Sequence, residues 1–90
     1  MNVRALLTVR GKVQGVSFRK HTLRMAQKLR VSGWVRNLDN GSVQGCFEGP
    51  RSQVEALIAW CSFGPERAVV EALTSEFHSF TGEFQEFCIR

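Results

Sequence analysis

The segment GKVQGVSFR, residues 11–19, combines two glycines with a small polar residue and an arginine. Glycines permit a tight turn in which successive backbone N–H groups point into one concavity, and the N-terminus of a following helix adds partial positive charge. Arg19 would close that concavity with a planar guanidinium that matches two phosphate oxygens. Residues 14–19 could therefore bind a phosphate-like dianion, although the same residues could also form an ordinary strand-to-helix turn.

A second motif has the Cys-to-Arg spacing of a cysteine phosphatase, but the residues around it do not fit a phosphate site. Cys61 and Arg67 in CSFGPER satisfy the Cys-x5-Arg pattern by which cysteine phosphatases place a thiolate beneath a phosphate. Here Cys61 falls on the apolar face of an expected helix, Glu66 would add a like charge, and Pro65 lacks an N–H donor. We interpret this spacing as a coincidence.

The residues that commonly bind metals are isolated from one another in the sequence. His21 and His78 have no cysteine or carboxylate at ligand spacing, and the three cysteines form no CxxC pair. We therefore expect no metal site, no cofactor, and free, buried thiols at Cys46, Cys61 and Cys88.

The elements around the glycine-containing segment follow from the spacing of apolar residues. Residues 3–10 alternate as in a strand, with Ala5, Leu7 and Val9 on one side. Residues 18–29 have helical periodicity, and Ser17 precedes them as an expected N-cap. The apolar face of this helix comprises Thr22, Met25, Ala26 and Leu29.

The rest of the chain predicts two more strands, a helix, and a final pair of strands. Residues 33–49 indicate two strands joined through Asp39, Asn40 and Gly41, because Asn-Gly supplies the positive φ angles of tight hairpins. Val54, Leu57, Ile58 and Cys61 mark a second amphipathic helix that should begin near Ser52. Residues 68–80 look strand-like, and residues 84–90 should form a strand with Phe87 and Ile89 facing inward.

This order of elements indicates one α+β domain spanning residues 1–90. The βαββαβ order, with a possible late extra strand, is typical of the ferredoxin-like sandwich. Right-handed crossovers would place both helices on one face of an antiparallel sheet.

The charge of the chain is compatible with several classes of binding partner and does not identify one of them. Twelve Lys and Arg against eight Asp and Glu give a net charge of +4 and a pI near 9.5, so the surface should attract anions. This charge is compatible with binding of nucleic acid, of phosphorylated metabolites or of no anionic partner at all. The apolar run near the N-terminus, residues 5–9, is too short for a signal peptide or membrane span. We therefore expect a cytoplasmic protein without a membrane partner.

Taken together, GKVQGVSFR, GWVRN and the glycine of the hairpin resemble the acylphosphatase family. FGPERAVV and the terminal FCI resemble later segments of the same family, so the likeness covers nearly the whole chain. The resemblance implies that Arg19 binds phosphate and that Asn37 positions the attacking water. It implies that the substrate-binding loop comprises Gln14, Gly15, Val16, Ser17, Phe18 and Arg19. Arg30 departs from the family, which usually has glycine just past the first helix, in a left-handed position.

The activity that this resemblance implies is hydrolysis of the carboxyl-phosphate anhydride bond of small acyl phosphates, giving a carboxylate and inorganic phosphate. A carboxylate is a good leaving group, so no general acid is needed. Phosphoryl transfer can then rely on positioning and electrostatics. On this hypothesis Asn37 holds the water, whose proton passes to an oxygen of the substrate itself.

Two other functions are compatible with the same layout. Basic ferredoxin-like domains can bind RNA, but residues 3–10 contain no aromatic residue and SVQGCFEG lacks the aromatic run of RNA recognition domains. A regulatory interaction domain without turnover is the other alternative, and the presence of both Arg19 and Asn37 argues against it. We expect a monomer that binds an acyl phosphate and inorganic phosphate but no nucleic acid.

Overall fold

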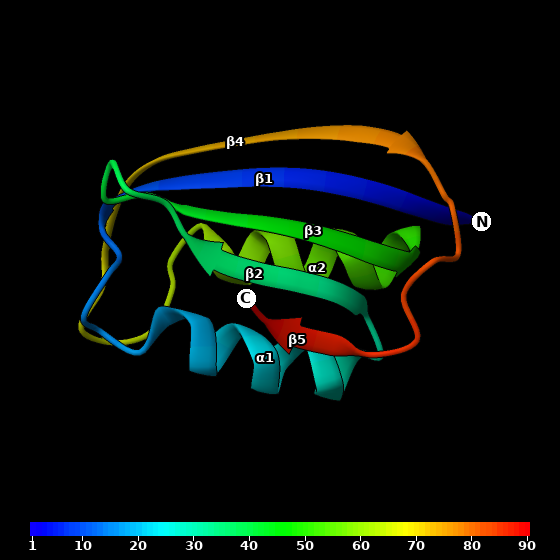
Figure 1. Cartoon of the computed structure of the whole chain (residues 1–90), viewed down its shortest axis with the longest axis horizontal. Helices are drawn as coiled ribbons and strands as arrows, with labels where there is room; N and C mark the ends of the chain where they lie inside the picture. The colour runs from blue at the N-terminus through cyan, green and yellow to red at the C-terminus, as the bar shows by residue number, and fades with distance from the viewer.

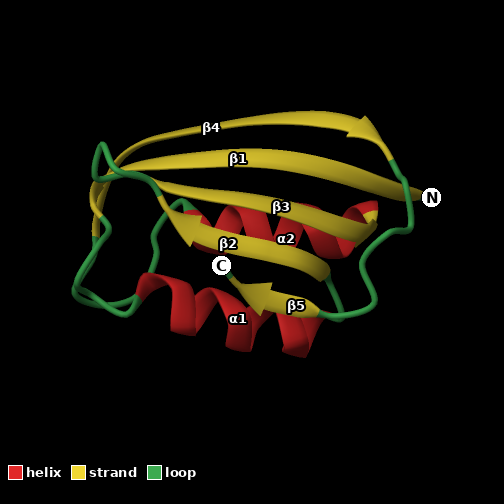
Figure 2. Ribbon diagram, viewed as in Figure 1, coloured by secondary structure: helices red, strands yellow, loops and turns green.

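The computed structural model describes residues 1–90, which form a five-stranded sheet and two helices. The elements, in chain order, are β1 (Asn2–Lys12), α1 (Phe18–Leu29), β2 (Ser32–Asn37), β3 (Val43–Pro50), α2 (Arg51–Cys61), β4 (Val69–Ser79) and β5 (Phe87–Ile89). The strand order is β4-β1-β3-β2-β5, and both helices cover the same face (Figures 1 and 2). The expected ferredoxin-like α+β sandwich is confirmed, with β5 as the late extra strand.

The sheet is not antiparallel throughout. The pairs β1–β3, β1–β4 and β2–β3 are antiparallel as expected, whereas β5 pairs with β2 in parallel. The reason is topological: residues 80–86 cross the end of the sheet from one edge strand to the other and reverse the chain once (Figure 1). A strand antiparallel to β4 must run parallel to β2.

The core lies between the sheet and the helices. Alternation in β1 buries Ala5, Leu7 and Val9, as the sequence predicts. From the second helix, Val54, Leu57 and Cys61 are fully buried against this face. Burial raises the pKa of the Cys61 thiol to about 12, which leaves it protonated at neutral pH and makes it a poor nucleophile.

Three expectations about individual positions are wrong. Cys88 is exposed, although Cys46 and Cys61 are buried free thiols. Phe87 is buried, but Ile89 is 41% exposed because β5 is a short edge strand. The hairpin connection spans residues 38–42 and includes Asn40 and Gly41 as expected, with a hydrogen bond from the Leu38 N–H to the Ser42 carbonyl; only Gly41 has a positive φ, so the positive φ expected at Asn40 is wrong.

The first helix ends at Arg30 in a left-handed conformation, with φ 58° and ψ 41°. The Val31 N–H donates to the Ala26 carbonyl across this turn at 2.9 Å. This six-to-one bond is typical of the Schellman motif, in which glycine normally occupies the left-handed position. The left-handed helix end is therefore kept, although arginine and not glycine occupies it.

A buried carboxylate joins the outer face of the sheet to the β4–β5 connection. Glu48 is 0% exposed, and its Oε2 accepts hydrogen bonds from Arg4 Nε at 3.0 Å, the Thr81 N–H at 2.9 Å and the Thr81 hydroxyl at 2.8 Å. Burial alone would raise the pKa of Glu48, but these bonds and the Arg4 charge outweigh burial and lower it. We call Arg4, Glu48 and Thr81 the outer-face cluster.

Neither helix is long and apolar enough to cross a membrane.

Replacing Arg30 by Gly should stabilise the protein. Glycine adopts the left-handed conformation without the steric penalty of a Cβ atom, so we expect the free energy of unfolding to rise by about 1 kcal/mol. The melting temperature should rise by roughly 4–8 °C. Arg24→Gly, at an exposed position inside the same helix, should instead lose about 1 kcal/mol. Urea denaturation measures both; equal destabilisation would contradict this interpretation of the helix end.

Replacing Glu48 by Gln should destabilise the fold by about 2 kcal/mol at neutral pH, because charge-assisted hydrogen bonds are lost from a buried position. The folded-state pKa is lowered, so the carboxylate contributes its stability above its unfolded-state pKa of about 4.3 and loses it as the pH falls through the folded-state pKa. The acid side of the stability curve should therefore be shallower in Glu48→Gln.

Denaturation between about pH 3 and about pH 7 tests this dependence. Glu66→Gln, at an exposed position, is the matched control and should leave the curve unchanged. An identical acid slope in the wild type and Glu48→Gln would show that the outer-face cluster is not linked to the pH dependence.

Candidate active site

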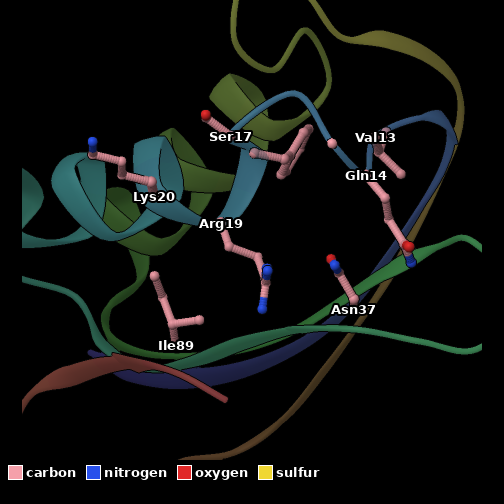
Figure 3. Close-up of a pocket in the computed structure, with 9 residues that line it drawn as sticks. Val13, Gln14, Ser17, Arg19, Lys20, Asn37 and Ile89 are labelled. Carbon is pink, nitrogen blue, oxygen red and sulfur yellow. The ribbon is translucent and has the colours of Figure 1, made fainter.

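A pocket of about 400 Å³ lies at one end of the sheet, between the β1–α1 loop and the ends of β2 and β5 (Figure 3). Because α1 carries the chain back along the sheet, β2 runs parallel to β1 and ends at the same side of the molecule (Figure 1). The lining residues are Val13, Gln14, Gly15, Ser17, Phe18, Arg19, Lys20, Asn37 and Ile89.

The backbone of the loop forms the wall of this pocket nearest to α1. Gly15 has φ 75° and Ser17 has φ 61°, while the residues between and beside them do not have positive φ. Such alternation turns successive N–H groups toward one side and creates an anion-binding concavity. None of the hydrogen bonds formed outside helices and strands uses the N–H of residues 14–17 as donor. These donors, and those of the first turn of α1, are free to bind an anion.

Ser17 occupies the expected N-cap position but does not cap the helix with its side chain. A capping residue normally has an extended backbone, whereas Ser17 is left-handed. Its carbonyl instead accepts hydrogen bonds from the His21 N–H at 3.1 Å and is 2.8 Å from the His21 Nδ1. Ser17 therefore shapes the loop through its backbone, and its side chain is exposed at the pocket.

Arg19 is the second residue of α1, and its half-buried side chain extends across the pocket (Figure 3). None of the salt bridges in the structure involves Arg19. No carboxylate lines the pocket, whereas Lys20 adds a second cation to its rim. The guanidinium is therefore a cation without an internal counterion, which favours binding of an anionic ligand.

Asn37 is the last residue of β2 and faces the pocket from the side opposite the loop (Figure 3). Its Oδ1 atom is buried and has no hydrogen-bond partner in the protein. Buried polar atoms are nearly always paired, so an unpaired carboxamide at a pocket wall indicates a group kept for a ligand or water. Arg19 and Asn37 therefore contribute to the same pocket from two different elements.

Gln14 connects the two sides of the pocket. Its Nε2 donates to the Leu38 carbonyl at 2.8 Å and to the Ser42 carbonyl at 3.0 Å. Both acceptors belong to the connection that begins directly after Asn37. The Gln14 side chain therefore fixes the loop relative to the end of β2, and its N–H is the part left available to a ligand.

The two apolar residues of the expected binding loop anchor it in the core. Val16 is 4% exposed and does not line the pocket, so only its N–H could contact a ligand. Phe18 is 2% exposed and packs against Trp60, with ring centroids 5.7 Å apart. With both side chains buried, the intervening backbone is held at the pocket surface.

The sequence did not predict three of the pocket residues, namely Val13, Lys20 and Ile89. Lys20 directly follows Arg19, so its position in the first helical turn was a usable signal. Ile89 could not be found from local pattern, because its place at the pocket depends on β5 pairing with β2. No group of three or more His, Cys, Asp or Glu side chains that could hold a metal ion occurs in the structure.

Comparisons with known proteins identify the same family as the sequence motifs. The family model described as Acylphosphatase matches residues 5–89. A protein named acylphosphatase from Geobacter sulfurreducens is 53% identical over 90 residues, covering 100% of this chain and 99% of that protein.

Solved structures agree with this match over the whole fold. An acylphosphatase from Coxiella burnetii superposes with a TM-score of 0.93 at 34% identity, covering 99% of this chain and 93% of that one. An acylphosphatase from Bacillus subtilis superposes with a TM-score of 0.94 at 27% identity, covering 98% of each chain.

Proposed function

The chain belongs to the acylphosphatase family, and we propose how its pocket performs the reaction. The protein is an enzyme that hydrolyses acyl phosphates, cleaving the anhydride bond between a carboxyl group and phosphate. The products are a carboxylate and inorganic phosphate. The residue roles below are our proposal for this reaction.

The observation that carries the proposal is the meeting of three kinds of group in one pocket. The unpaired N–H groups of residues 14–17, the guanidinium of Arg19 and the carboxamide of Asn37 all contribute to it. The first two are donors suited to phosphate oxygens. The third lies on another wall, where it can hold a water against the bound phosphoryl group.

Arg19 and the loop amides, from Gln14 through Phe18, bind the phosphoryl group in this mechanism. In the transition state, negative charge spreads over the three equatorial oxygens of the phosphoryl group. Donors held in position by the fold stabilise that charge without reorganising, which is the main source of catalysis in such sites. The anchors Val16 and Phe18 supply the required rigidity from the core.

Asn37 positions the water that attacks phosphorus. The water oxygen forms a bond to phosphorus while the bond from phosphorus to the acyl oxygen breaks, and the electron pair leaves on the carboxylate. The water proton passes to a phosphate oxygen of the substrate, so no protein base is required. Neither His21 nor His78 lines the pocket, in agreement with this scheme.

The alternative of an RNA-binding or regulatory module without turnover is not favoured, because relatives covering the full chain are acylphosphatases. We further propose that residues 1–90 act as one monomeric domain in the cytoplasm, with no nucleic acid, membrane or cofactor partner. Small size, the scattered basic residues and the free cysteines support this part of the proposal.

Replacing Asn37 by Ala should lower kcat by about 100-fold while KM changes by less than about threefold, because the carboxamide acts on water in the transition state. Steady-state hydrolysis of acetyl phosphate measures both constants. Asn2→Ala, at an exposed position at the start of β1, is the matched control. A loss confined to KM would refute the proposed role.

Replacing Arg19 by Lys should weaken inhibition by inorganic phosphate about tenfold, because lysine keeps the charge but cannot donate the paired hydrogen bonds of a guanidinium. Competitive inhibition by phosphate measures this directly. Arg24→Lys, at an exposed position in the same helix, should have no effect. Unchanged phosphate inhibition in Arg19→Lys would remove Arg19 from the binding site.

A further inference from the structure

The pocket contains one exposed apolar side chain that the phosphoryl-transfer mechanism does not use. Three of the nine lining residues are apolar, namely Val13, Phe18 and Ile89. Val13 and Phe18 are 1% and 2% exposed, so they offer almost no surface to a ligand. Ile89 is 41% exposed, and it is therefore the apolar surface that a bound molecule can contact.

The position of Ile89 is fixed by a strand and not by a flexible tail. Ile89 pairs with Val35 of β2, and the following Arg90 N–H donates to the Val35 carbonyl at 2.8 Å. Phe87, two residues earlier, is buried against Phe47 with ring centroids 5.8 Å apart. The strand that presents Ile89 is thus held by backbone pairing with β2 and by the packing of Phe87 in the core.

Ile89 and Asn37 lie on different sides of the Arg19 guanidinium in the view of Figure 3. Displacement at phosphorus is roughly in line, so the attacking water and the leaving carboxylate occupy opposite sides of the phosphoryl group. If Asn37 holds the water, the acyl group must point away from Asn37. Ile89 is the apolar group that lies on that side of Arg19.

We propose that Ile89 contacts the acyl group of the substrate and gives the enzyme a preference for apolar acyl groups over acetyl. This inference rests on the proposed function, and in particular on the role of Asn37 in placing the water. The physical basis is the removal of apolar surface from water, which grows with the size of the acyl group. The phosphoryl contacts are the same for every acyl phosphate. Ile89 therefore changes the relative kcat/KM of substrates that differ in their acyl group.

The test compares kcat/KM for benzoyl phosphate and acetyl phosphate, each corrected for spontaneous hydrolysis. The wild type should prefer benzoyl phosphate, and Ile89→Ala should lower the benzoyl-to-acetyl ratio by about fivefold. Rates with acetyl phosphate should change by less than about twofold, because acetyl presents little surface to this side chain. Ile89→Leu, with the same number of carbon atoms, should retain most of the preference.

Two further variants separate this role from a structural one. Cys88→Ala alters the exposed neighbour on the same strand and should leave the ratio unchanged. Ile89→Thr keeps the branched shape that suits a strand while removing apolar surface, so it should lower the ratio even if Ile89→Ala unfolds. Melting temperature and phosphate inhibition verify that each variant keeps its fold and its phosphoryl site.

The outcomes distinguish the two proposals. If the wild type hydrolyses both substrates but Ile89→Ala and Ile89→Thr lower both rates equally, or leave the ratio unchanged, the acyl contact is wrong and the proposed phosphoryl site stands. If Asn37→Ala and Arg19→Lys leave hydrolysis of both substrates unaffected, the proposed function of the pocket is wrong, and the acyl contact that rests on it is wrong as well.

Discussion

The site depends on backbone N–H groups that the fold leaves without partners. Buried or half-buried amides are normally paired, and an unpaired one destabilises the protein. Here the N–H groups of residues 14–17 have no partner within the protein, and they lie beside a pocket that Gly15 and Ser17 line in left-handed conformations. For Ser17 this conformation itself costs on the order of 1 kcal/mol, because it is not a glycine. An anion in the pocket would accept hydrogen bonds from these N–H groups. Its binding would therefore offset the cost of the strained loop.

The rest of the fold holds this loop in place and brings a second group to it. Val16 and Phe18 bury their side chains on either side of Ser17, which keeps the intervening amides at the surface of the pocket. The right-handed crossover through α1 returns β2 parallel to β1, so Asn37 reaches the same end of the sheet. Gln14 then joins the loop to the connection that follows Asn37. Arg19 and Asn37, eighteen positions apart in sequence, are thereby brought to the same pocket.

The parts of the structure that could be predicted from sequence are those that local chemistry determines. The helix from 18 to 29, the burial of alternate residues in β1 and the left-handed Arg30 all follow from nearby residues or from family motifs. The parallel pairing of β5 could not be predicted, because a three-residue strand has no distinctive periodicity and its partner is chosen by the path of the chain. Ile89 was therefore expected in the core and instead lies at the pocket. Glu48 likewise lies on the outer face of the sheet, and its burial depends on Thr81, far away in sequence.

The proposed mechanism explains why so few residues would suffice, and why it assigns substrate choice to a different element. The leaving carboxylate is a weak base, so the protein must stabilise charge and orient water but need not supply an acid or a base. In the proposed mechanism these tasks fall to the β1–α1 loop, Arg19 and Asn37, and they are identical for every acyl phosphate. The acyl group can be recognised only by what lies on the other side of the phosphoryl group. In this chain that side carries β5, an added edge strand whose connection to β4 is held by the outer-face cluster. On these two proposals, phosphoryl binding and acyl recognition are built on separate elements, so changes at the C-terminal strand should alter the acyl preference without disturbing the phosphoryl site.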